Sequence, residues 1–281
     1  MPSTAPQGHY FRTMPILTVL ITGGTSGIGR ACALAFGRAG YQVAITGRDE
    51  AKLADTAQAL TAAGIANLAI RADVGDEAAA ERAVRETVAR FGGLDVLLNN
   101  AGISMRARFQ DADLEVIKRL MQTNFFGTVF TTKFALPYLL KSKGSIVGIS
   151  SIAGYRGLPG RTGYSASKFA MNGFLESLRT ELLDQGVHVL TAAPGFTSSN
   201  IRQTALAADG SAQGESPRDE GAMMSSEAVA DEILKAVRQR KRTIVLTGQG
   251  KLVVFLNKLL PGLSDKLVLG HFRKEEGVDV G

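Results

Sequence analysis

A glycine-rich turn near the start of the chain constrains the fold more than any other feature of the sequence. Residues 16–21 form a β-rich, mostly apolar run of strand length, which suits a parallel strand buried on both faces. The turn TGGTSGIG at residues 22–29 follows, and residues 30–39 then read as a helix that ends at Gly40. In this context, glycines let the backbone approach a dinucleotide pyrophosphate at the helix N-terminus. A glycine turn without a ligand fits the flanking elements poorly.

Strand-like and helical segments alternate along the rest of the chain. The further expected strands are residues 42–46, 68–71, 94–98, 145–149, 187–191 and 243–247, and the further expected helices are residues 50–63, 76–91, 114–141, 164–183 and 226–240. Such alternation predicts a parallel sheet with helices on both faces. A chain of 281 residues is long enough for one large domain of this kind.

The composition agrees with a folded globular protein. Hydrophobic residues make up 45% of the chain and charged residues 21%. Cys32 is the only cysteine, which excludes an internal disulfide, and its place on the apolar side of the first helix favours a packed thiol. The three histidines, His9, His188 and His271, are scattered, so we expect no metal site.

A tyrosine and a lysine four residues apart give the first indication of chemistry. Tyr164 and Lys168 share one face of an expected helix, and Ser151 lies thirteen positions before Tyr164. A phenol ordinarily titrates near pH ~10, and a neighbouring cation lowers this pKa toward the neutral range, in which acid–base catalysis is efficient. Taken alone, the pair fits an ordinary surface Tyr and Lys better. The remaining motifs of the chain reverse that preference.

These features recur together in the short-chain dehydrogenase/reductase family, which the chain resembles over residues 14–247. The matching motifs are TGGTSGIG at residues 22–29, Asp73-Val74, Asn99-Asn100-Ala101-Gly102, Asn124, Ser151, Tyr164, Lys168 and Pro194-Gly195. The resemblance implies an α/β fold, with a single Rossmann-type domain built on a doubly wound parallel sheet of about seven strands. It also implies an enzyme that binds NAD(P) and moves a hydride between this cofactor and a carbonyl or secondary alcohol.

The resemblance assigns catalytic roles to Asn124, Ser151, Tyr164 and Lys168. Ser151 and Tyr164 would bind the substrate carbonyl, and Tyr164 would give its proton to the developing alkoxide. Lys168 would tune Tyr164 and bond the nicotinamide ribose. Asn124 would hold a water that connects Lys168 to solvent, although a polar residue satisfied within a helix fits the sequence equally well. This set favours an enzyme over the alternative, an NADP(H)-binding scaffold or sensor with little catalytic activity.

The resemblance also implies a larger set of cofactor-binding residues. The set comprises Gly23, Thr25, Ser26, Gly27, Ile28, Gly29, Arg48, Asp73, Val74, Asn100, Ala101, Gly102, Tyr164, Lys168, Pro194, Gly195, Thr197 and Ser199. Asp73 would contact the adenine, residues 100–102 would pass the adenine ribose, and Ser199 would bond the nicotinamide carboxamide.

The end of the second expected strand favours the phosphorylated cofactor. An acidic residue there would bind the ribose 2′-hydroxyl of NAD and repel a 2′-phosphate. This chain has Gly47 at that position and Arg48 after it, and a guanidinium can pair with a phosphate. Thr25 and Ser26 could add hydroxyl donors. We therefore expect NADP(H), and the alternative is that Arg48 is only a solvated loop charge.

The chain divides into a polar N-terminal tail at residues 1–13, a catalytic domain at residues 14–250 and a C-terminal extension at residues 251–281. Within the domain, residues 198–226 are polar and rich in Gly, Ser and Ala, which is typical of a lid or a disordered loop. By resemblance, this segment covers the substrate.

The C-terminal part of the chain combines basic and apolar residues, and we expect it to be helical. Residues 235–274 contain ten Lys or Arg and one acidic residue, whereas the whole chain has a net charge of only +6. The apolar runs between them are shorter than the ~18 residues that span a bilayer. This combination fits a helix on an anionic membrane surface as well as it fits a dimer contact or a helix packed beside the substrate pocket. No nucleic-acid motif accompanies the charge, so we expect no nucleic-acid partner.

Two short segments narrow the resemblance. Residues 206–211 and 260–263 are similar to the branch that contains the dehydrogenase/reductase member 7B proteins and the 11β-hydroxysteroid dehydrogenases, which implies a hydrophobic or lipid-like ketone as substrate. The family also implies a homo-oligomer, a dimer or a tetramer, formed through the helix that carries Tyr164. Because the N-terminal residues show no anchor or signal peptide, we expect a cytoplasmic protein, peripheral at a membrane surface if the extension binds lipid.

Overall fold

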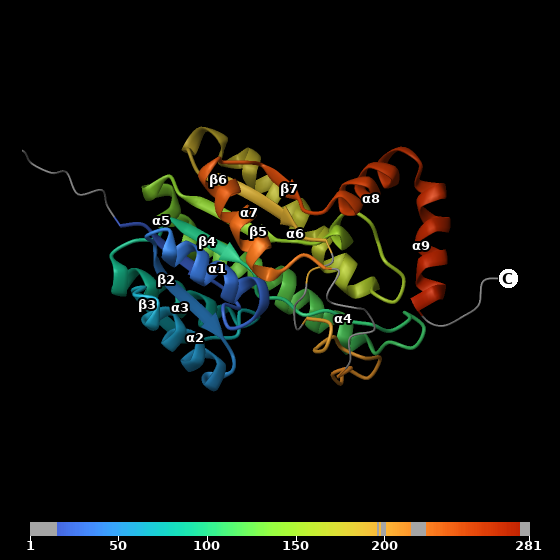
Figure 1. Cartoon of the computed structure of the whole chain (residues 1–281), viewed down its shortest axis with the longest axis horizontal. Coiled ribbons are helices and arrows are strands. Elements are labelled where there is room, and N and C mark those ends of the chain that lie inside the picture. The colour runs from blue at the N-terminus through green and yellow to red at the C-terminus, as the bar shows by residue number, and fades with distance from the viewer. Residues whose placement is uncertain (1–15, 196, 198–200, 215–222, 276–281) are drawn as a thin grey trace, which may run out of the picture.

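The computed structural model of the chain describes residues 16–195, 197, 201–214 and 223–275, and one parallel sheet forms its centre (Figure 1). The sheet has seven strands in the order β3-β2-β1-β4-β5-β6-β7, and every neighbouring pair is parallel. The strands are β1 (Thr18–Ile21), β2 (Gln42–Gly47), β3 (Asn67–Arg71), β4 (Val96–Asn99), β5 (Ser145–Ile149), β6 (His188–Ala193) and β7 (Thr243–Val245). The predicted doubly wound sheet is confirmed.

Helices cover both faces of this sheet. They are α1 (Gly27–Arg38), α2 (Glu50–Ala62), α3 (Glu77–Phe91), α4 (Leu114–Leu120), the π-helical segment η1 (Met121–Phe126), α5 (Gly127–Ser142), the short helix η2 (Ile152–Gly154), α6 (Thr162–Glu181), the short helix η3 (Leu183–Gln185), α7 (Ser226–Arg238), α8 (Gly248–Leu259) and α9 (Pro261–Glu275). Short polar residues begin several of them. Asp49, Asp76 and Ser225 are N-caps whose side chains accept a hydrogen bond from the backbone N–H three residues later.

Two hydrophobic cores, one on each face, hold the helices to the sheet. Val19 and Ile21 of β1 lie in the core that contains residues of α1 and α7, whereas Leu20 lies in the core that contains residues of α5 and α6. All of β1 is buried, as expected for a parallel strand covered on both sides. Cys32 is buried in the first core, and this burial raises the pKa of its thiol.

The single helix predicted over residues 114–141 is interrupted by the π-helical segment. A π turn adds one residue to the helical repeat and leaves the segment helical, so apolar periodicity does not reveal it. The Thr128 hydroxyl donates a hydrogen bond of 2.9 Å to the carbonyl oxygen of Asn124 within this region. Side-chain bonds of this kind compete with the regular backbone ladder. The segment contains Asn124, one of the four residues predicted to be catalytic.

The predicted site residues meet at the carboxyl edge of the sheet. β1 lies between β2 and β4, so the chain builds one half of the sheet outward from β1 and later builds the other half. In open α/β sheets, ligands bind at this switch point, beyond the carboxyl ends of the strands. The glycine turn follows β1 there, and residues 100–102 follow β4 beside it. Ser151 follows β5, and Pro194 follows β6, at the same edge.

The C-terminal extension forms two helices, α8 and α9, at one end of the molecule (Figure 1). Half of the exposed large apolar side chains of the described residues lie on these helices or between them, namely Leu252, Phe255, Leu259, Leu260, Leu263, Leu267 and Leu269. Across the described ranges, no helix combines the length and the hydropathy that a membrane crossing requires.

Candidate active site

The glycine turn after β1 is packed so tightly that two of its positions leave no room for a side chain. Gly23 has a φ of +63°, and a Cβ atom there would lie 2.8 Å from the Cα of Ala101. A Cβ atom at Gly29 would lie 2.2 Å from the carbonyl oxygen of Gly23. The turn therefore offers bare backbone at the N-terminus of α1.

The segment after β4 holds this turn in place. The Asn100 side chain donates hydrogen bonds of 3.0 Å to the carbonyl oxygens of Thr22 and Gly23. In return, the Thr22 hydroxyl accepts bonds of 3.0 Å from the backbone N–H groups of Asn100 and Ala101. Asn100 and Ala101 thus fix the shape of the turn, in addition to any contact with the cofactor.

The start of α1 suits an anionic group. Ser26 is the N-cap residue, yet its side chain makes no capping hydrogen bond, and the first turn of α1 contains no acidic residue. Gly27 has a φ of +48°, and Ile28 packs against the core beneath the turn. A helix N-terminus carries unpaired N–H groups and a partial positive charge. The residues present therefore fit a dinucleotide pyrophosphate.

Two residues predicted to contact the adenosine half of the cofactor lie side by side. The Arg48 guanidinium and the Asp73 carboxylate are 3.7 Å apart, and both side chains are exposed. Thr25 reaches the same corner, since a Cβ atom at Gly47 would lie 2.6 Å from the Thr25 methyl group. Val74 is buried against the start of α5. A long exposed ion pair is weak, so a phosphate could replace Asp73 as the partner of Arg48.

Tyr164 lies in the first turn of α6, and its phenol is buried beside Ser151. Tyr164 is 8% exposed, and the neighbouring Ser151 side chain lowers the pKa of its phenol by favouring the phenolate. Ser151 follows β5 and is the N-cap residue of η2, where its Oγ accepts a hydrogen bond of 3.2 Å from the Ala153 N–H. The structure therefore brings together the two hydroxyls that were predicted to bind a carbonyl oxygen.

Lys168 lies one turn further along α6 and is almost completely buried. Its Nζ donates a hydrogen bond of 2.8 Å to the carbonyl oxygen of Ile149, the last residue of β5. The same atom lies 5.8 Å from the centroid of the Tyr164 ring. The two side chains are neighbours, as the four-residue spacing predicts. Burial lowers the pKa of the Lys168 ammonium to about 8.

The prediction that Lys168 lowers the pKa of Tyr164 toward neutrality was wrong. Burial has the largest influence, and it raises the pKa of the phenol above its ordinary value. The hydrogen bond with Ser151 opposes this rise, as do the positive charges of Arg161 and Arg202. The Lys168 ammonium is instead bonded to the main chain and lies over the ring. At neutral pH the site therefore holds a protonated phenol, which is a proton donor.

Arg161 and Arg202 are functional candidates that the sequence analysis did not identify. Arg161 is the N-cap residue of α6, three positions before Tyr164, and burial lowers the pKa of its guanidinium. Arg202 is buried and donates to the Thr197 carbonyl oxygen at 2.7 and 3.1 Å. The three-residue spacing could have located Arg161. Arg202 lies in an irregular segment, in which no periodicity indicates where a side chain points.

Asn124 is fully buried, and its side chain is bonded to two separate parts of the chain. Its Oδ1 accepts a bond of 2.8 Å from the Ile103 N–H, and its Nδ2 donates bonds of 2.9 Å to the Ile103 carbonyl and to the Ser167 hydroxyl. A Cβ atom at Gly102 would lie 3.1 Å from this Oδ1 and 3.6 Å from Nζ of Lys168. Asn124 therefore lies next to the lysine and joins the loop after β4 to α6.

The loop after β6 lies against the residue that follows Ser151. The Pro194 carbonyl accepts a hydrogen bond of 3.3 Å from the Ile152 N–H. Thr197 is buried, and its hydroxyl donates to the Gly195 carbonyl at 3.3 Å. Ser199, which was also predicted to bind the cofactor, lies outside the described residues.

Apolar side chains pack around the phenol of Tyr164. Met105, Ala153 and Leu206 are buried with it in one cluster. Leu206 belongs to the segment predicted to cover the substrate, and its main chain pairs with that of Met105. The described part of that segment thus lies over the phenol. Sequence analysis missed this lining because its members come from three distant stretches of the chain.

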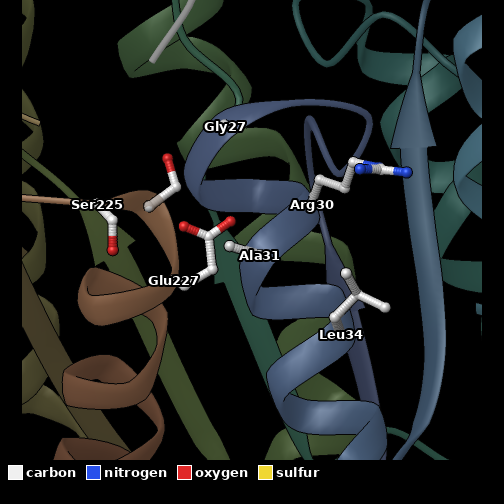
Figure 2. A pocket seen from close by; sticks show the side chains of 7 residues that line it. Gly27, Arg30, Ala31, Leu34, Ser225 and Glu227 are labelled. Atoms are coloured by element: carbon white, nitrogen blue, oxygen red, sulfur yellow. The ribbon is translucent and has the colours of Figure 1, made fainter. Parts of the chain in front are cut away.

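A pocket of about 240 Å³ lies apart from this cluster, between α1 and α7. Figure 2 shows that Ala31 and Leu34 of α1 line one side, and that Ser225 and Glu227 at the start of α7 line the other. The pocket reaches Gly27 of the glycine turn but contains none of the four predicted catalytic residues. Its lining includes one cation, Arg30, and one carboxylate, Glu227, so charge alone does not favour an anion there.

Comparison with known proteins adds evidence that does not depend on this geometry. The family model described as short chain dehydrogenase matches residues 17–210. The "Dehydrogenase/reductase SDR family member 7B" of Bos taurus is 38% identical over 265 residues, which cover 92% of this chain and 82% of the bovine protein. The "11-beta-hydroxysteroid dehydrogenase 1A" of Arabidopsis thaliana is 38% identical over 187 residues, which cover 66% of this chain and 53% of the plant protein.

Two solved structures share the fold. A short chain dehydrogenase/reductase from Burkholderia phymatum in complex with NAD has a TM-score of 0.79 at 23% identity, over 88% of this chain and 95% of its own. An alcohol dehydrogenase from the archaeon Thermococcus sibiricus complexed with 5-hydroxy-NADP has a TM-score of 0.73 at 22% identity, over 82% and 96%. Both support the Rossmann-type architecture.

The buried ammonium of Lys168 should make stability rise with pH in the alkaline range. Its pKa in the folded protein is about 8, below the ~10.4 of an unfolded chain, so the unfolded state binds more protons between these values. The cost of burying the charge is fully present below pH ~8 and is relieved as pH rises toward ~10. We expect urea unfolding free energies of the wild type to rise over this range relative to those of Lys168→Met. A constant difference between the two proteins would contradict the depressed pKa.

Proposed function

Because the chain belongs to the short-chain dehydrogenase/reductase family, we propose that it is an NADP(H)-dependent oxidoreductase that acts on a carbonyl or a secondary alcohol. One observation carries this proposal. The buried phenol of Tyr164 lies beside the Ser151 hydroxyl and the ammonium of Lys168. Burying these polar groups together costs desolvation free energy, and nucleotide binding alone does not require such a buried cluster.

The residues around Tyr164 suit the reduction of a carbonyl. The Ser151 and Tyr164 hydroxyls donate hydrogen bonds to the substrate oxygen, and burial keeps the phenol protonated at neutral pH. When bound, the reduced nicotinamide would supply a hydride for the carbonyl carbon. As negative charge develops on the oxygen, Tyr164 transfers its proton to it. The positive charges of Arg161 and Arg202 stabilise the phenolate that remains.

The remaining candidates hold the cofactor and align the donors. The backbone of the glycine turn and the Ser26 hydroxyl would hold the pyrophosphate, since the start of α1 is free of acidic groups. Lys168 would bond the ribose next to the nicotinamide. Asn124 keeps the loop after β4 in register with α6, because its side chain bonds both.

Replacing Tyr164 by Phe tests the proposed proton donor with little change in side-chain volume. We expect carbonyl reduction to fall by about 10²–10⁴-fold, because the alkoxide loses its proton source. The Kd for NADPH should be unchanged. NADPH oxidation with a panel of aldehydes and ketones measures turnover, and fluorescence titration measures binding.

Tyr41→Phe is the matched control, because its ring packs edge-on against Phe36, away from this site. Full activity of Tyr164→Phe would refute the role of the phenol. A wild-type protein that binds NADPH but oxidises it with no carbonyl would favour the scaffold or sensor.

The preference for NADP(H) is proposed from the end of β2. Gly47 leaves no carboxylate to repel a 2′-phosphate. The exposed Arg48 guanidinium forms a 3.7 Å pair with Asp73, the one ion pair of Arg48 among the described residues. The fold itself leaves the choice open, since one structural neighbour was solved with NAD and another with a derivative of NADP.

Replacing Arg48 by Ala tests this preference. We expect the Kd for NADPH to rise about 10- to 100-fold, since hydrogen bonds to a charged group contribute about 1.5–3 kcal/mol, while the Kd for NADH stays the same. Arg71→Ala is the matched control, because Arg71 lies beside Gly47 on β3 and its exposed pair with Glu50 spans 3.3 Å. Equal wild-type affinities for NADH and NADPH would contradict the proposal.

We propose a hydrophobic or lipid-like ketone as substrate. The apolar side chains of Met105, Ala153 and Leu206 pack around Tyr164. The name of the plant relative refers to a hydroxysteroid, which is a large apolar substrate. Lower KM values for long-chain than for short-chain ketones would support this substrate class, and equal values would argue against it.

We propose that α8 and α9, which we call the α8–α9 unit, contact an anionic membrane surface. Leu252, Phe255 and Leu259 are each more than half exposed and recur at helical spacing along α8. Exposed Lys251 and Lys258 lie next to them in the sequence. This pattern is typical of interfacial helices. A two-fold contact with a second copy is less favourable, because it would place like charges against each other.

Replacing Phe255 and Leu259 by Glu should abolish binding to anionic vesicles, because apolar area is lost and the net positive charge of the unit is reduced. We expect the wild type to float with phosphatidylserine-containing vesicles and to remain in solution with purely phosphatidylcholine vesicles. Both side chains are exposed, so the variant should fold. Failure of the wild type to float would refute membrane contact.

We also propose that the chain forms a homo-oligomer, a dimer or a tetramer, through contacts of α6. We propose a cytoplasmic location for this oligomer. Phe169 on α6 and Phe126 on the π-helical segment expose large aromatic surfaces, which is typical of a protein–protein contact. Sedimentation analysis of the full chain tests this, and a monomer would refute it.

A further inference from the structure

The segment that joins Ser151 to Tyr164 lies between α6 and the α8–α9 unit. We call this segment, residues 152–161, the catalytic loop. On its inner side, the Asn172 side chain of α6 donates a hydrogen bond of 2.8 Å to the carbonyl oxygen of Gly154. Ser151 directly precedes this loop, and Tyr164 follows it by three residues. The conformation of the loop therefore influences the distance between the two catalytic hydroxyls.

Arg156 ties the catalytic loop to both helices of the α8–α9 unit. Its Nη1 donates a bond of 2.9 Å to Oδ1 of Asn257 on α8, and its Nη2 pairs with the Asp265 carboxylate on α9. Asn257 returns a bond of 3.0 Å to the carbonyl oxygen of Tyr155. The Arg156 side chain is only 15% exposed. Its forked guanidinium can hold partners on two helices at once, which an ammonium cannot do equally well.

Packing contacts extend this tie along the catalytic loop. A Cβ atom at Gly250 of α8 would lie 2.7 Å from the side chain of Ile152. Near the other end, a Cβ atom at Gly160 would lie 2.9 Å from the Phe272 ring of α9. The α8–α9 unit therefore contacts the loop near its beginning, in its middle and near its end.

The residue that precedes α8 is held in a strained conformation. Thr247 has a φ of +81°, a region that β-branched residues avoid, and its hydroxyl accepts a bond of 3.1 Å from the Gly250 N–H. It also lies against Gly195 in the loop after β6. Such strain persists only where the surrounding contacts enforce it. The orientation of α8 is thus fixed by the same region that surrounds the active site.

We propose that Arg156 is a positioning residue of the reaction, which sets the placement of the Ser151 hydroxyl beside Tyr164 by holding the catalytic loop against the α8–α9 unit. This inference rests on the proposed oxidoreductase function. It makes the C-terminal extension a working part of the active site, in addition to any contact with lipid.

Because the Asp265 partner is exposed, we expect the loss of Arg156 to alter the reaction more than the stability of the fold. Asp265 is 67% exposed, and an ion pair with one exposed partner contributes little to global stability. A displacement of about 1 Å at a reacting group, by contrast, can lower a rate by ~10²-fold.

Three variants of the full-length protein test the proposal with NADPH and a carbonyl substrate. We expect Arg156→Gln to lower kcat about 10- to 100-fold, with an unchanged Kd for NADPH. The kcat of Arg156→Lys should lie between that of Arg156→Gln and that of the wild type, because a single ammonium replaces the forked guanidinium. Glu50→Gln is the control, since it breaks the exposed 3.3 Å pair with Arg71 far from the loop, and it should leave kcat unchanged.

The pH profile separates positioning from a purely structural role. The interaction with Ser151 lowers the pKa of Tyr164, and the positive charges of Arg161, the last residue of the loop, and of Arg202 lower it as well. Arg202 and the neighbouring Lys168 lie outside the loop. If Ser151 or Arg161 moves away, the pKa of the phenol rises. Alcohol oxidation needs the phenolate, so its rate increases with pH. In Arg156→Gln, this increase should occur at higher pH than in the wild type. If Arg156→Gln has the same pH profile and the same kcat as the wild type, the proposal is overturned.

Hydrogen exchange gives a readout that does not depend on turnover. Peptides that cover residues 152–161 should exchange faster in Arg156→Gln than in the wild type, and unchanged exchange would overturn the tie. If the wild type shows no turnover, the proposed function fails, but this comparison still decides whether Arg156 holds the loop. Should Arg156→Gln fail to fold, Asp265→Asn gives the same comparison, because its carboxylate is largely exposed.

Discussion

The hydrogen bond from Lys168 to the carbonyl oxygen of Ile149 is the constraint on which the active site depends. It joins the helix that carries Tyr164 to the end of the strand that leads into Ser151. A buried ammonium without a partner is costly, so α6 cannot slide along the sheet without a large loss of free energy. Asn124 adds a second connection, because its side chain bonds Ser167 on the same helix. Together the two bonds hold the phenol and the serine hydroxyl in one place.

Most of the fold could be predicted from the sequence, because the signals there are local. Strand and helix patterns alternate, and the tight contacts of Gly23 and Gly29 admit no other residue type. The spacing of Tyr164 and Lys168 was sufficient to place them together. The pKa of the phenol could not be predicted in the same way, since it depends on burial by distant segments that include Leu206. The position of Arg202 was equally inaccessible, because it lies in an irregular segment. For α8 and α9, the sequence indicated helices but left three partners open, since helical periodicity does not identify the surface that a helix contacts.

The two halves of the candidate site are built by different means. On the nucleotide side, backbone atoms and a few short side chains form a turn that Asn100 holds rigidly. On the substrate side, the walls come from the loop after β4, the segment after β6 and the catalytic loop. The first kind of construction relies mainly on backbone atoms, and two solved structures at 22–23% identity share this fold over most of this chain. The second kind relies on side chains that loops supply.

Gly47 has a consequence for the redesign of this protein. A Cβ atom there would lie 2.6 Å from the methyl group of Thr25, so a side chain at this position requires Thr25 to shift or to be replaced. A carboxylate in place of Gly47 would favour an unphosphorylated dinucleotide. Cofactor choice at this corner is therefore epistatic, because the effect of an acid at position 47 depends on the side chain at position 25.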